Sequence, residues 1–298
     1  MDREMESIQR NETWELVDPP NNPRPIGVKW IFKTKYDEHG NVSKYKARLV
    51  AKGYNKKYGV DYLDVFAPVI RFDIVRLILA LAARNNWYLH QIDVKTTFLN
   101  GNLNEQVYTE QPEGYIKPGE ERKVCHLKKA LYGLKQAPRA WYSRIDEFFR
   151  SNGFKKCVYE HTLFIKNTKG SKMVVCLYVD DLIIASDSLD MINQLKTSMK
   201  LEFEMTDLGT LHYFLGMEVK YEDGNILVSQ QRYAKGLLKR FRMENCNTIS
   251  TPMEYGQRLT KDDPEEEVNQ NMYRSLMGSL MYLTNTRPDI MFAVSKVS

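Results

Sequence analysis

The segment Met173–Ser186 reads MVVCLYVDDLIIAS and says most about how this chain folds. Two apolar, β-prone runs flank Asp180 and Asp181, which predicts a β-hairpin with two adjacent carboxylates at its tip. Two-residue hairpin turns favour Asn-Gly or Asp-Gly, so an Asp-Asp pair is a poor choice for the turn alone. Two carboxylates about 4 Å apart also repel by about 4 kcal/mol at an effective dielectric of 20. A bound Mg²⁺ or Mn²⁺ would turn this repulsion into attraction; an ordinary exposed turn is the alternative.

A third carboxylate, Asp93, ends the β-prone stretch Trp87–Val94. The chain turns directly afterwards, in QIDVKTTFLNG (91–101), so Asp93 is expected at a strand end that faces a cleft. Taken alone, it could equally be a turn or helix-capping aspartate. Three aspartates on the ends of neighbouring strands can hold two metal ions about 3.5–4 Å apart, which supports in-line phosphoryl transfer.

Positive charge gathers between Arg24 and Lys57, where ten Lys or Arg and two acids give +8, more than the +5 of the whole chain. This segment predicts a β-hairpin of VKWIFKTKY (28–36) and VSKYKARLVAK (42–52) around a Gly-Asn turn. Because side chains alternate between the faces of a strand, most cations share one face and the apolar residues share the other. A face of one sign indicates a polyanionic partner, whereas a solvated surface usually mixes both signs.

The remaining pattern mixes helices and strands, which predicts the α+β class. The expected elements are helices over 73–84, 137–151 and 188–201, a turn-rich segment over 102–121, a hairpin of 212–221 with 226–230, and mostly helices over 231–298.

Composition excludes several classes of protein. With 43% hydrophobic and 27% charged residues, the chain is neither wholly disordered nor fibrous. Apolar stretches reach only about ten residues, whereas a membrane-spanning helix needs about 20, so no membrane partner is expected. The N-terminal MDREMESIQRNETWE mixes charges and does not predict a secretory signal. Four cysteines without CxxC spacing predict reduced thiols in an intracellular protein, and five scattered histidines do not indicate a metal site.

Nine motifs, in order along nearly the whole chain, resemble the reverse transcriptases of copia-type long-terminal-repeat retrotransposons. They are TWELVDPP (13–20), GVKWIFKTKYDEHGNVSKYKARLVAKGY (27–54), DVFAPVIRFDIVRLILALAA (64–83), QIDVKTTFLNG (91–101), VYTEQPEGY (107–115), LKKALYGLKQAPRAWY (127–142), LYVDDLIIAS (177–186), LGTLHYFLGMEV (208–219) and SLMGSLMYLTNTRPDI (275–290). The resemblance implies a right-hand polymerase fold with fingers, a ferredoxin-like palm and a partial helical thumb. Its implied divisions are 1–86 (N-terminal segment and fingers), 87–103 (palm), 104–134 (fingers), 135–228 (palm) and 229–298 (thumb and start of the connection).

The resemblance also implies roles for the carboxylates. Asp93, Asp180 and Asp181 match the catalytic residues that bind two Mg²⁺ or Mn²⁺ ions. The backbone carbonyl of Val94 is expected to face one of these ions. Thr97 is a departure, because the family often has alanine at this place.

Other matches concern the nucleotide. Arg48, with Lys33 or Lys35, matches the fingers cations that grip the triphosphate. Phe98 matches the aromatic gate that excludes a ribose 2′-hydroxyl, although a phenylalanine is often simply a core residue. Gln136 matches a glutamine near the nucleotide sugar, with a helix-capping role as the alternative.

A further match concerns the primer. The hairpin that holds the primer terminus in the family, the primer grip, corresponds to Phe214, Leu215, Gly216 and Met217.

The implied function is that of an RNA-directed DNA polymerase, in which a primer 3′-hydroxyl attacks the α-phosphate of a dNTP. The expected partners are an RNA or DNA template with its primer and dNTPs. The expected location is intracellular, in a cytoplasmic virus-like particle or the nucleus. Family members usually continue into a ribonuclease H domain, and this chain ends just after RPDI (287–290), so that activity is expected to be absent.

Two alternatives remain at this point. The chain could be an inactive, truncated retroelement remnant that folds and binds nucleic acid without polymerising. It could also be a metal phosphodiesterase on a similar palm, which would need no cationic hairpin.

Overall fold

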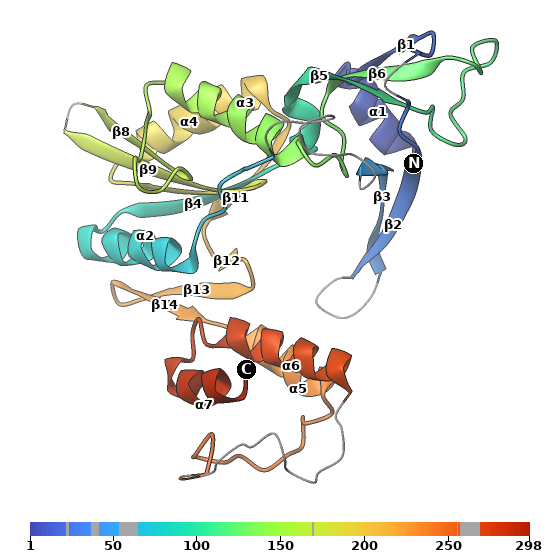
Figure 1. The fold of residues 1–298 in the computed structure, drawn as a ribbon. Helices are drawn as coiled ribbons and strands as arrows, with labels where there is room; N and C mark the ends of the chain where they lie inside the picture. The colour runs from blue at the N-terminus through green and yellow to red at the C-terminus, as the bar shows by residue number, and fades with distance from the viewer. Residues whose placement is uncertain (22–23, 37–41, 54–64, 169, 255, 257–268) are drawn as a thin grey trace. The chain divides into compact units, whose positions relative to one another are not determined.

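The computed structural model describes residues 1–21, 24–36, 42–53, 65–168, 170–254, 256 and 269–298 (Figure 1). These residues form two compact units. The first comprises Met1–Arg71 and Trp87–Thr210, and the second comprises Phe72–Asn86 and Leu211–Ser298. Each unit mixes helices with antiparallel strands, so the predicted α+β class is confirmed. The five-part division into fingers, palm and thumb stays a prediction.

A six-stranded antiparallel sheet organises the first unit, in the order β11-β4-β10-β9-β8-β7. Helices α3 (Ala137–Ser151) and α4 (Leu189–Glu202) cover one face of it (Figure 1). The core between them is rich in aromatic residues, among them Trp141 and Phe149 of α3. The strands are β4 (Tyr88–Val94), β7 (Lys155–Lys156), β8 (Leu163–Thr168), β9 (Ser171–Tyr178), β10 (Asp181–Ser186) and β11 (Met205–Thr210).

Sequence pattern explains why α3 and the central hairpin form where they do. Helix α3 begins at Ala137 with Pro138 in its first turn, a position that needs no backbone N–H. Its buried residues recur at helical spacing, and its bounds agree with the predicted helix over 137–151. Strands β9 and β10 correspond to the two apolar runs around Asp180 and Asp181, and both are buried on the two sides of the sheet.

A second sheet of the first unit, in the order β1-β6-β5, corrects one prediction. Residues 102–121 were predicted to be turn-rich, but Asn102–Thr109 form β5. The acidic and amide residues of this segment obscure its strand pattern, in which Leu103, Val107 and Thr109 occupy the more buried face. Several elements had no prediction, namely β7, β8 and β11 of the large sheet together with β1 (Trp14–Val17), β6 (Val124–Lys129), α1 (Asp2–Arg10) and the 3-10 helix η2 (Thr97–Asn100).

The cationic hairpin forms as predicted, from β2 (Val28–Tyr36) and β3 (Val42–Ala51). Lys33 lies opposite Lys46, and Arg48, two residues after Lys46, lies opposite Ile31. Because residues two apart in a strand share a face, Lys33, Lys46 and Arg48 lie on the same face. The predicted apolar face is buried only near the base of the hairpin, since Phe32 is 67% and Tyr45 is 77% exposed. The predicted Gly-Asn turn lies outside the described residues.

The second unit combines one helix from the first third of the chain with the C-terminal residues. Tyr282 packs at its centre, with ring centroids 5.7 Å from Phe72 and 4.8 Å from Tyr233. The predicted hairpin forms, and helices follow it as predicted; residues 257–268 lie outside the described residues. The elements are α2 (Phe72–Asn85), β12 (Tyr213–Phe214), β13 (Met217–Glu222), β14 (Asn225–Ser229), α5 (Gln231–Arg240), α6 (Gln270–Leu283), η3 (Pro288–Ile290) and α7 (Met291–Val297).

No helix in the described parts of the chain is both long enough and apolar enough to cross a membrane.

Candidate active site

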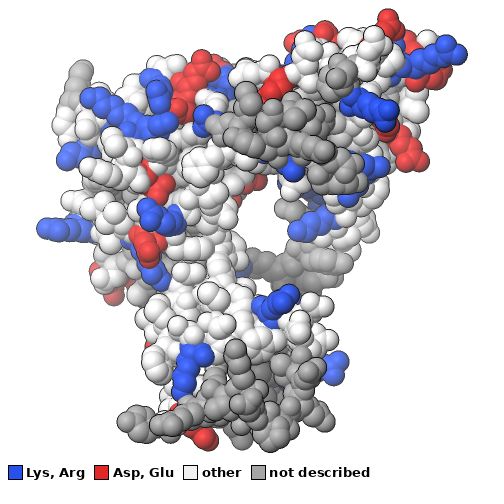
Figure 2. Space-filling view, viewed as in Figure 1, with Lys and Arg blue, Asp and Glu red and all other residues white. Residues whose placement is uncertain are grey.

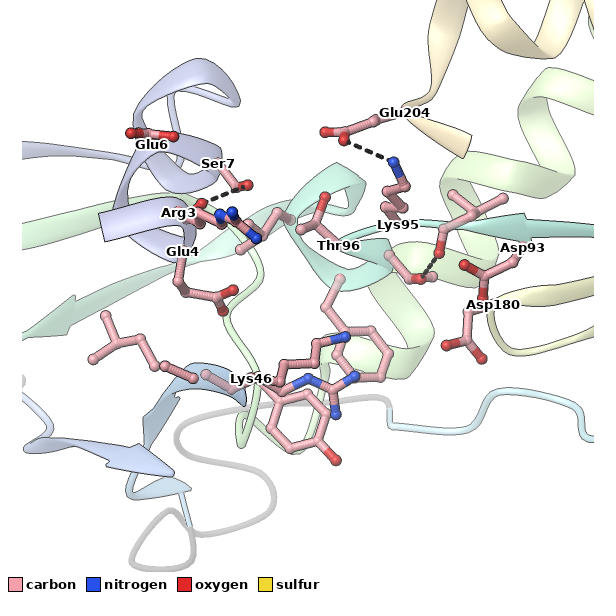
Figure 3. A pocket seen from close by; sticks show the side chains of 18 of the residues that line it. Arg3, Glu4, Glu6, Ser7, Lys46, Asp93, Lys95, Thr96, Asp180 and Glu204 are labelled. Atoms are coloured by element: carbon pink, nitrogen blue, oxygen red, sulfur yellow. Dashed lines mark hydrogen bonds and ion pairs between the residues drawn. The ribbon is translucent and has the colours of Figure 1, made fainter. Parts of the chain in front are cut away.

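The strand register brings the three predicted aspartates to one end of the large sheet. Asp181, the first residue of β10, pairs with Asp93 near the end of β4. Asp180 precedes it in the β9–β10 turn, and its carbonyl accepts a hydrogen bond of 2.8 Å from the backbone N–H of Val94. Figure 3 shows the side chains of Asp93 and Asp180 next to each other. Two strands that are distant in sequence therefore present their carboxylates at a common point.

The electrostatics of this point are unfavourable to three negative charges. Burial, the Asp180 charge and the Asp93 charge raise the pKa of Asp181 to about 6, in that order of importance. The amide nitrogen of Gln91 donates a hydrogen bond of 3.2 Å to Asp181, which opposes the shift without cancelling it. A positive ligand at this end of the sheet would relieve the repulsion.

Carboxylate oxygens are the donors that Mg²⁺ and Mn²⁺ prefer, so the donor chemistry fits a hard divalent cation. In the described part of the chain, however, no three His, Cys, Asp or Glu side chains are arranged closely enough to hold a metal ion. The aspartates are thus gathered by the backbone, and their side chains would have to rotate toward one point to share an ion.

The turn that carries Asp180 is held from α3. Val179 has φ +55°, a left-handed conformation that is strained for a β-branched residue. Its carbonyl accepts a hydrogen bond of 2.6 Å from the indole N–H of Trp141, which is buried. A buried helix thereby fixes the backbone conformation of the turn between the carboxylates and β9.

The carbonyl of Val94, which was predicted to face a metal ion, has a protein partner. The hydroxyl of Thr97 donates a hydrogen bond of 2.9 Å to it. One lone pair of this carbonyl oxygen therefore remains for another ligand. An alanine at position 97, as is frequent in the family, would leave both lone pairs available.

A cavity of about 1000 Å³ opens beside the carboxylates, at the upper end of small-molecule pocket volumes of about 300–1,000 Å³. Its wall includes Asp93 and Asp180 together with the predicted nucleotide-binding residues Arg48 and Phe98. Other lining residues are Glu4, Ser7 and Arg10 of α1, Lys44 and Lys46 of β3, Lys95, Thr96, Leu131, Tyr132, Tyr178, Val179 and Glu204. Carboxylates, cations and an aromatic ring thus surround a single space.

Several predicted residues lie away from this cavity. Lys33 belongs to the cationic face but does not line the cavity, and the side chain of Lys35 lies outside the described residues. Gln136 is the buried N-cap residue of α3, and its side chain makes no capping hydrogen bond. Asp181 is half-buried and does not line the cavity either.

The four residues predicted to grip a primer form a tight turn of the second unit. Phe214 ends β12 and Met217 begins β13. Between them Leu215 and Gly216 have φ +47° and +81°, as a type I′ hairpin turn requires. Because both residues of the turn are left-handed, the hairpin follows the right-handed twist of its strands.

Sequence reasoning did not identify several residues of the cavity wall, among them Glu4, Lys46 and Tyr132. Figure 3 shows Glu4 of α1 beside Lys46 of β3. Burial raises the pKa of Glu4, while a hydrogen bond to the Leu49 backbone and the charges of Arg48 and Lys46 oppose the shift. Alternation along β3 could have indicated Lys46, because it shares a face with Arg48. No local signal indicated Glu4, since α1 is short and of mixed charge.

The positive charge of the hairpin face is a local feature. Figure 2 shows Lys and Arg side chains interspersed with Asp and Glu over the visible face of the first unit. The cavity has the same mixture in a small volume, with acids from β4 and the β9–β10 turn and with cations from β3. A ligand that carries both a divalent cation and several negative charges fits such a wall.

Comparison with known proteins gives consistent matches. The protein family described as "Reverse transcriptase (RNA-dependent DNA polymerase)" matches residues 11–255. The retrovirus-related Pol polyprotein from transposon TNT 1-94 of Nicotiana tabacum is 41% identical over 100% of this chain, which corresponds to 23% of that protein. The Pol polyprotein from transposon RE1 of Arabidopsis thaliana is 39% identical over 97% of the chain and 20% of that protein. The chain thus spans about a fifth of the length of these curated relatives.

Among solved structures, a foamy viral protease-reverse transcriptase in complex with double-stranded DNA matches 93% of this chain and 38% of that chain. Its TM-score is 0.43 and its sequence identity is 9%.

Proposed function

Because this chain belongs to the reverse transcriptase (RNA-dependent DNA polymerase) family, we propose that it catalyses RNA-directed DNA synthesis as part of a copia-type retrotransposon polyprotein. The substrates would be dNTPs and a primer annealed to an RNA or DNA template. The observation that carries the proposal is the shared cavity, which joins Asp93 and Asp180 to Arg48 and Phe98. The reaction needs carboxylates, a cation and an aromatic ring within the length of one nucleotide.

In this proposal Asp93, Asp180 and Asp181 hold two divalent cations, preferably Mg²⁺. When bound, such ions stabilise the attacking 3′-oxygen and the leaving pyrophosphate oxygen of an in-line displacement. The packed sheet already holds the backbone of the three aspartates at one end, so that only their side chains would have to rotate when the ions bind. Trp141 keeps the turn in place through its hydrogen bond to Val179.

The cations of β3 would act on the triphosphate. Arg48 and Lys46 both face the cavity and lie on the same side of the hairpin. A guanidinium and an ammonium group would offset the charge of the phosphates through charge-assisted hydrogen bonds. The neighbouring carboxylate of Glu4 limits the excess of positive charge before a nucleotide binds.

Phe98 would act on the sugar. It is half-buried, packs against two hydrophobic cores of the first unit and also lines the cavity. The gate and the core interpretations of this residue are therefore compatible, because packing from behind is what keeps a ring in one place. A ring at a fixed place can exclude a 2′-hydroxyl by overlap.

An intracellular location, in a cytoplasmic virus-like particle or the nucleus, is part of the same proposal. It is supported by the chemistry of the substrates and by the four cysteines, which are free thiols.

The test is primer extension by the purified protein with an RNA template, dNTPs and MgCl₂. We expect extension by the wild type and a loss of about 10³-fold or more in Asp93→Asn and Asp180→Asn, because each removes several kcal/mol of charge stabilisation. Asp190→Asn is the matched control, since Asp190 is an exposed aspartate of α4. Circular dichroism should show equal folding in all four proteins. Activity retained in Asp93→Asn would overturn the assignment, and an inactive but folded wild type would support a remnant without catalysis.

A further inference from the structure

Tyr132 stands between the two residues proposed to contact the nucleotide. The guanidinium carbon of Arg48 lies 5.0 Å from the centroid of the Tyr132 ring. On the other side, the Phe98 and Tyr132 ring centroids are 5.5 Å apart with an angle of 38° between the rings. The Tyr132 side chain is 40% exposed and lines the same cavity. One aromatic ring therefore contacts both the cation and the gate.

The backbone around Tyr132 is joined to the strand that carries Arg48. The backbone N–H of Ala51, at the end of β3, donates a hydrogen bond of 2.8 Å to the carbonyl of Tyr132. The next residue, Gly133, has φ +92°, and a Cβ atom added there would lie 2.2 Å from the Ala51 carbonyl oxygen. Because the two segments approach so closely, the backbone that carries the Tyr132 ring cannot shift without β3.

We propose that Tyr132 is a specificity-determining residue of the nucleotide site, and that its ring fixes the position of Arg48 relative to Phe98. This inference rests on the proposed function. The triphosphate contact and the sugar contact are then set by one element, so a nucleotide whose triphosphate is held by Arg48 has its C2′ edge held against Phe98. Discrimination between dNTP and rNTP depends on this fixed spacing as well as on the bulk of the gate.

The physical reason lies in the flexibility of an arginine. Its side chain has many rotamers, and ordering it costs conformational entropy. A ring face 5.0 Å away attracts the guanidinium and narrows its range of positions. The same ring supports Phe98 from one side. Loss of the ring should therefore weaken nucleotide binding and sugar discrimination together.

Both contacts are made by the ring, so the informative variants are Tyr132→Leu, which removes it, and Tyr132→Phe, which keeps it. The control is Tyr159→Leu, the same change at a residue that is 92% exposed and away from the cavity. Single-nucleotide insertion gives kcat and KM for a dNTP and its matching rNTP. Melting temperatures, with and without dNTP, check folding and nucleotide binding independently of catalysis.

We expect Tyr132→Leu to raise the dNTP KM about fivefold and to lower the dNTP-to-rNTP ratio of kcat/KM by a similar factor, because a partly exposed cation–π contact and a ring contact are both lost. Tyr132→Phe and Tyr159→Leu should stay within about twofold of the wild type. In an Arg48→Ala background the KM effect of Tyr132→Leu should disappear, and in a Phe98→Val background the effect on the ratio should disappear.

Three results would overturn the inference: unchanged KM and ratio in Tyr132→Leu, an equal loss in Tyr132→Phe, or full additivity in both double variants. A wild type that extends no primer would instead contradict the proposed function. In that case the dNTP-induced rise in melting temperature still decides, since it should be smaller in Tyr132→Leu than in Tyr132→Phe. Equal rises in the two variants would exclude the contact.

Discussion

Two hairpins border the cavity, and they are built in opposite ways. The β9–β10 hairpin lies inside a sheet, with Cys176 and Ile183 fully buried and with its turn held by Trp141. The β2–β3 hairpin is buried at its base, at Leu49, and exposed at Phe32 farther along. The carboxylates are thus placed by a packed interior, whereas the cations are placed by a strand pair that is fixed at one end. Catalytic groups must be held to a fraction of an ångström, which a packed sheet interior allows. Groups that bind a large anion tolerate more movement, so a strand pair that is fixed at one end is sufficient for them.

The difference in support predicts a large loss of stability when the base of the β2–β3 hairpin is loosened. Gly133→Ala should destabilise the protein by about 3 kcal/mol or more, because the methyl group would overlap the Ala51 carbonyl and Gly133 has positive φ. Gly119→Ala is the control, since Gly119 has φ +83° with nothing within 4 Å of an added Cβ. It should cost only about 1–2 kcal/mol from backbone strain. Urea denaturation measures both, and equal losses would show that the close approach has no energetic weight.

The second test separates the cations of the β2–β3 hairpin. Arg48→Ala should remove a charge-assisted contact that contributes about 1.5–3 kcal/mol to nucleotide binding. The dNTP KM should therefore rise roughly 10- to 150-fold. Lys33→Ala removes a charge from the same face but outside the cavity, so its effect should be several-fold smaller. Steady-state kinetics over a range of dNTP concentrations makes the measurement. A larger effect at Lys33 would place the main triphosphate contact at Lys33, which the sequence motif indicated together with Arg48.

The third test concerns the β9–β10 hairpin. Trp141→Phe removes the hydrogen bond to Val179 while keeping a ring in the core, and we expect kcat to fall about tenfold with an unchanged dNTP KM. Tyr142→Phe is the matched control, because the Tyr142 hydroxyl donates a hydrogen bond of 2.7 Å to the backbone carbonyl of His161, away from the turn. The free energy of unfolding should fall further in Trp141→Phe, which also removes part of a buried ring. A fall in kcat of the same size in the control would mean that the effect is general destabilisation.

The smallest expected effect is a pH dependence of stability. Asp181 has a folded-state pKa of about 6, above its ordinary 3.8, so the folded state binds the proton more tightly. The stability that the folded state gains from this tighter proton binding is fully present below pH 4 and is lost as the pH rises through 6. After allowance for solvent screening of a half-buried group, it amounts to about 1 kcal/mol. In EDTA, the melting temperature of Asp181→Asn should therefore exceed that of the wild type at pH 7–8 and equal it at pH 4. A difference in melting temperature that does not change with pH would contradict the repulsion among the three aspartates.

Local patterns were sufficient for the elements that carry the carboxylates. The apolar runs on both sides of Asp180 and Asp181 predicted β9 and β10, because strands buried on both faces need continuous apolar residues. A strand that ends at Asp93 was also predicted, and the register with β10 then brings the aspartates together. The alternation in β2 and β3 predicted the cationic face, because successive side chains of a strand point to opposite faces.

What the sequence could not predict consists of contacts between distant segments. Nothing near Tyr132 indicates that its ring meets Arg48, and nothing near Trp141 indicates that its indole meets the carbonyl of Val179. Such pairs follow from how the loops and helices pack, which local periodicity does not encode. Tyr45 lies on the predicted apolar face of β3 and is nevertheless 77% exposed, because alternation gives the face of a strand but not whether another element covers that face.

The interleaved second unit has a consequence for how the protein is made. Its helix α2 has buried Val75, Ile78 and Leu79, yet the other elements of its unit begin at Leu211, more than a hundred residues later. At about 5–20 residues per second, the ribosome releases α2 on the order of ten seconds before those partners exist. During that interval an apolar helix face has no native cover. We therefore expect the nascent chain to bind chaperones that hold apolar segments, and a pause in translation between α2 and Leu211 to increase its aggregation.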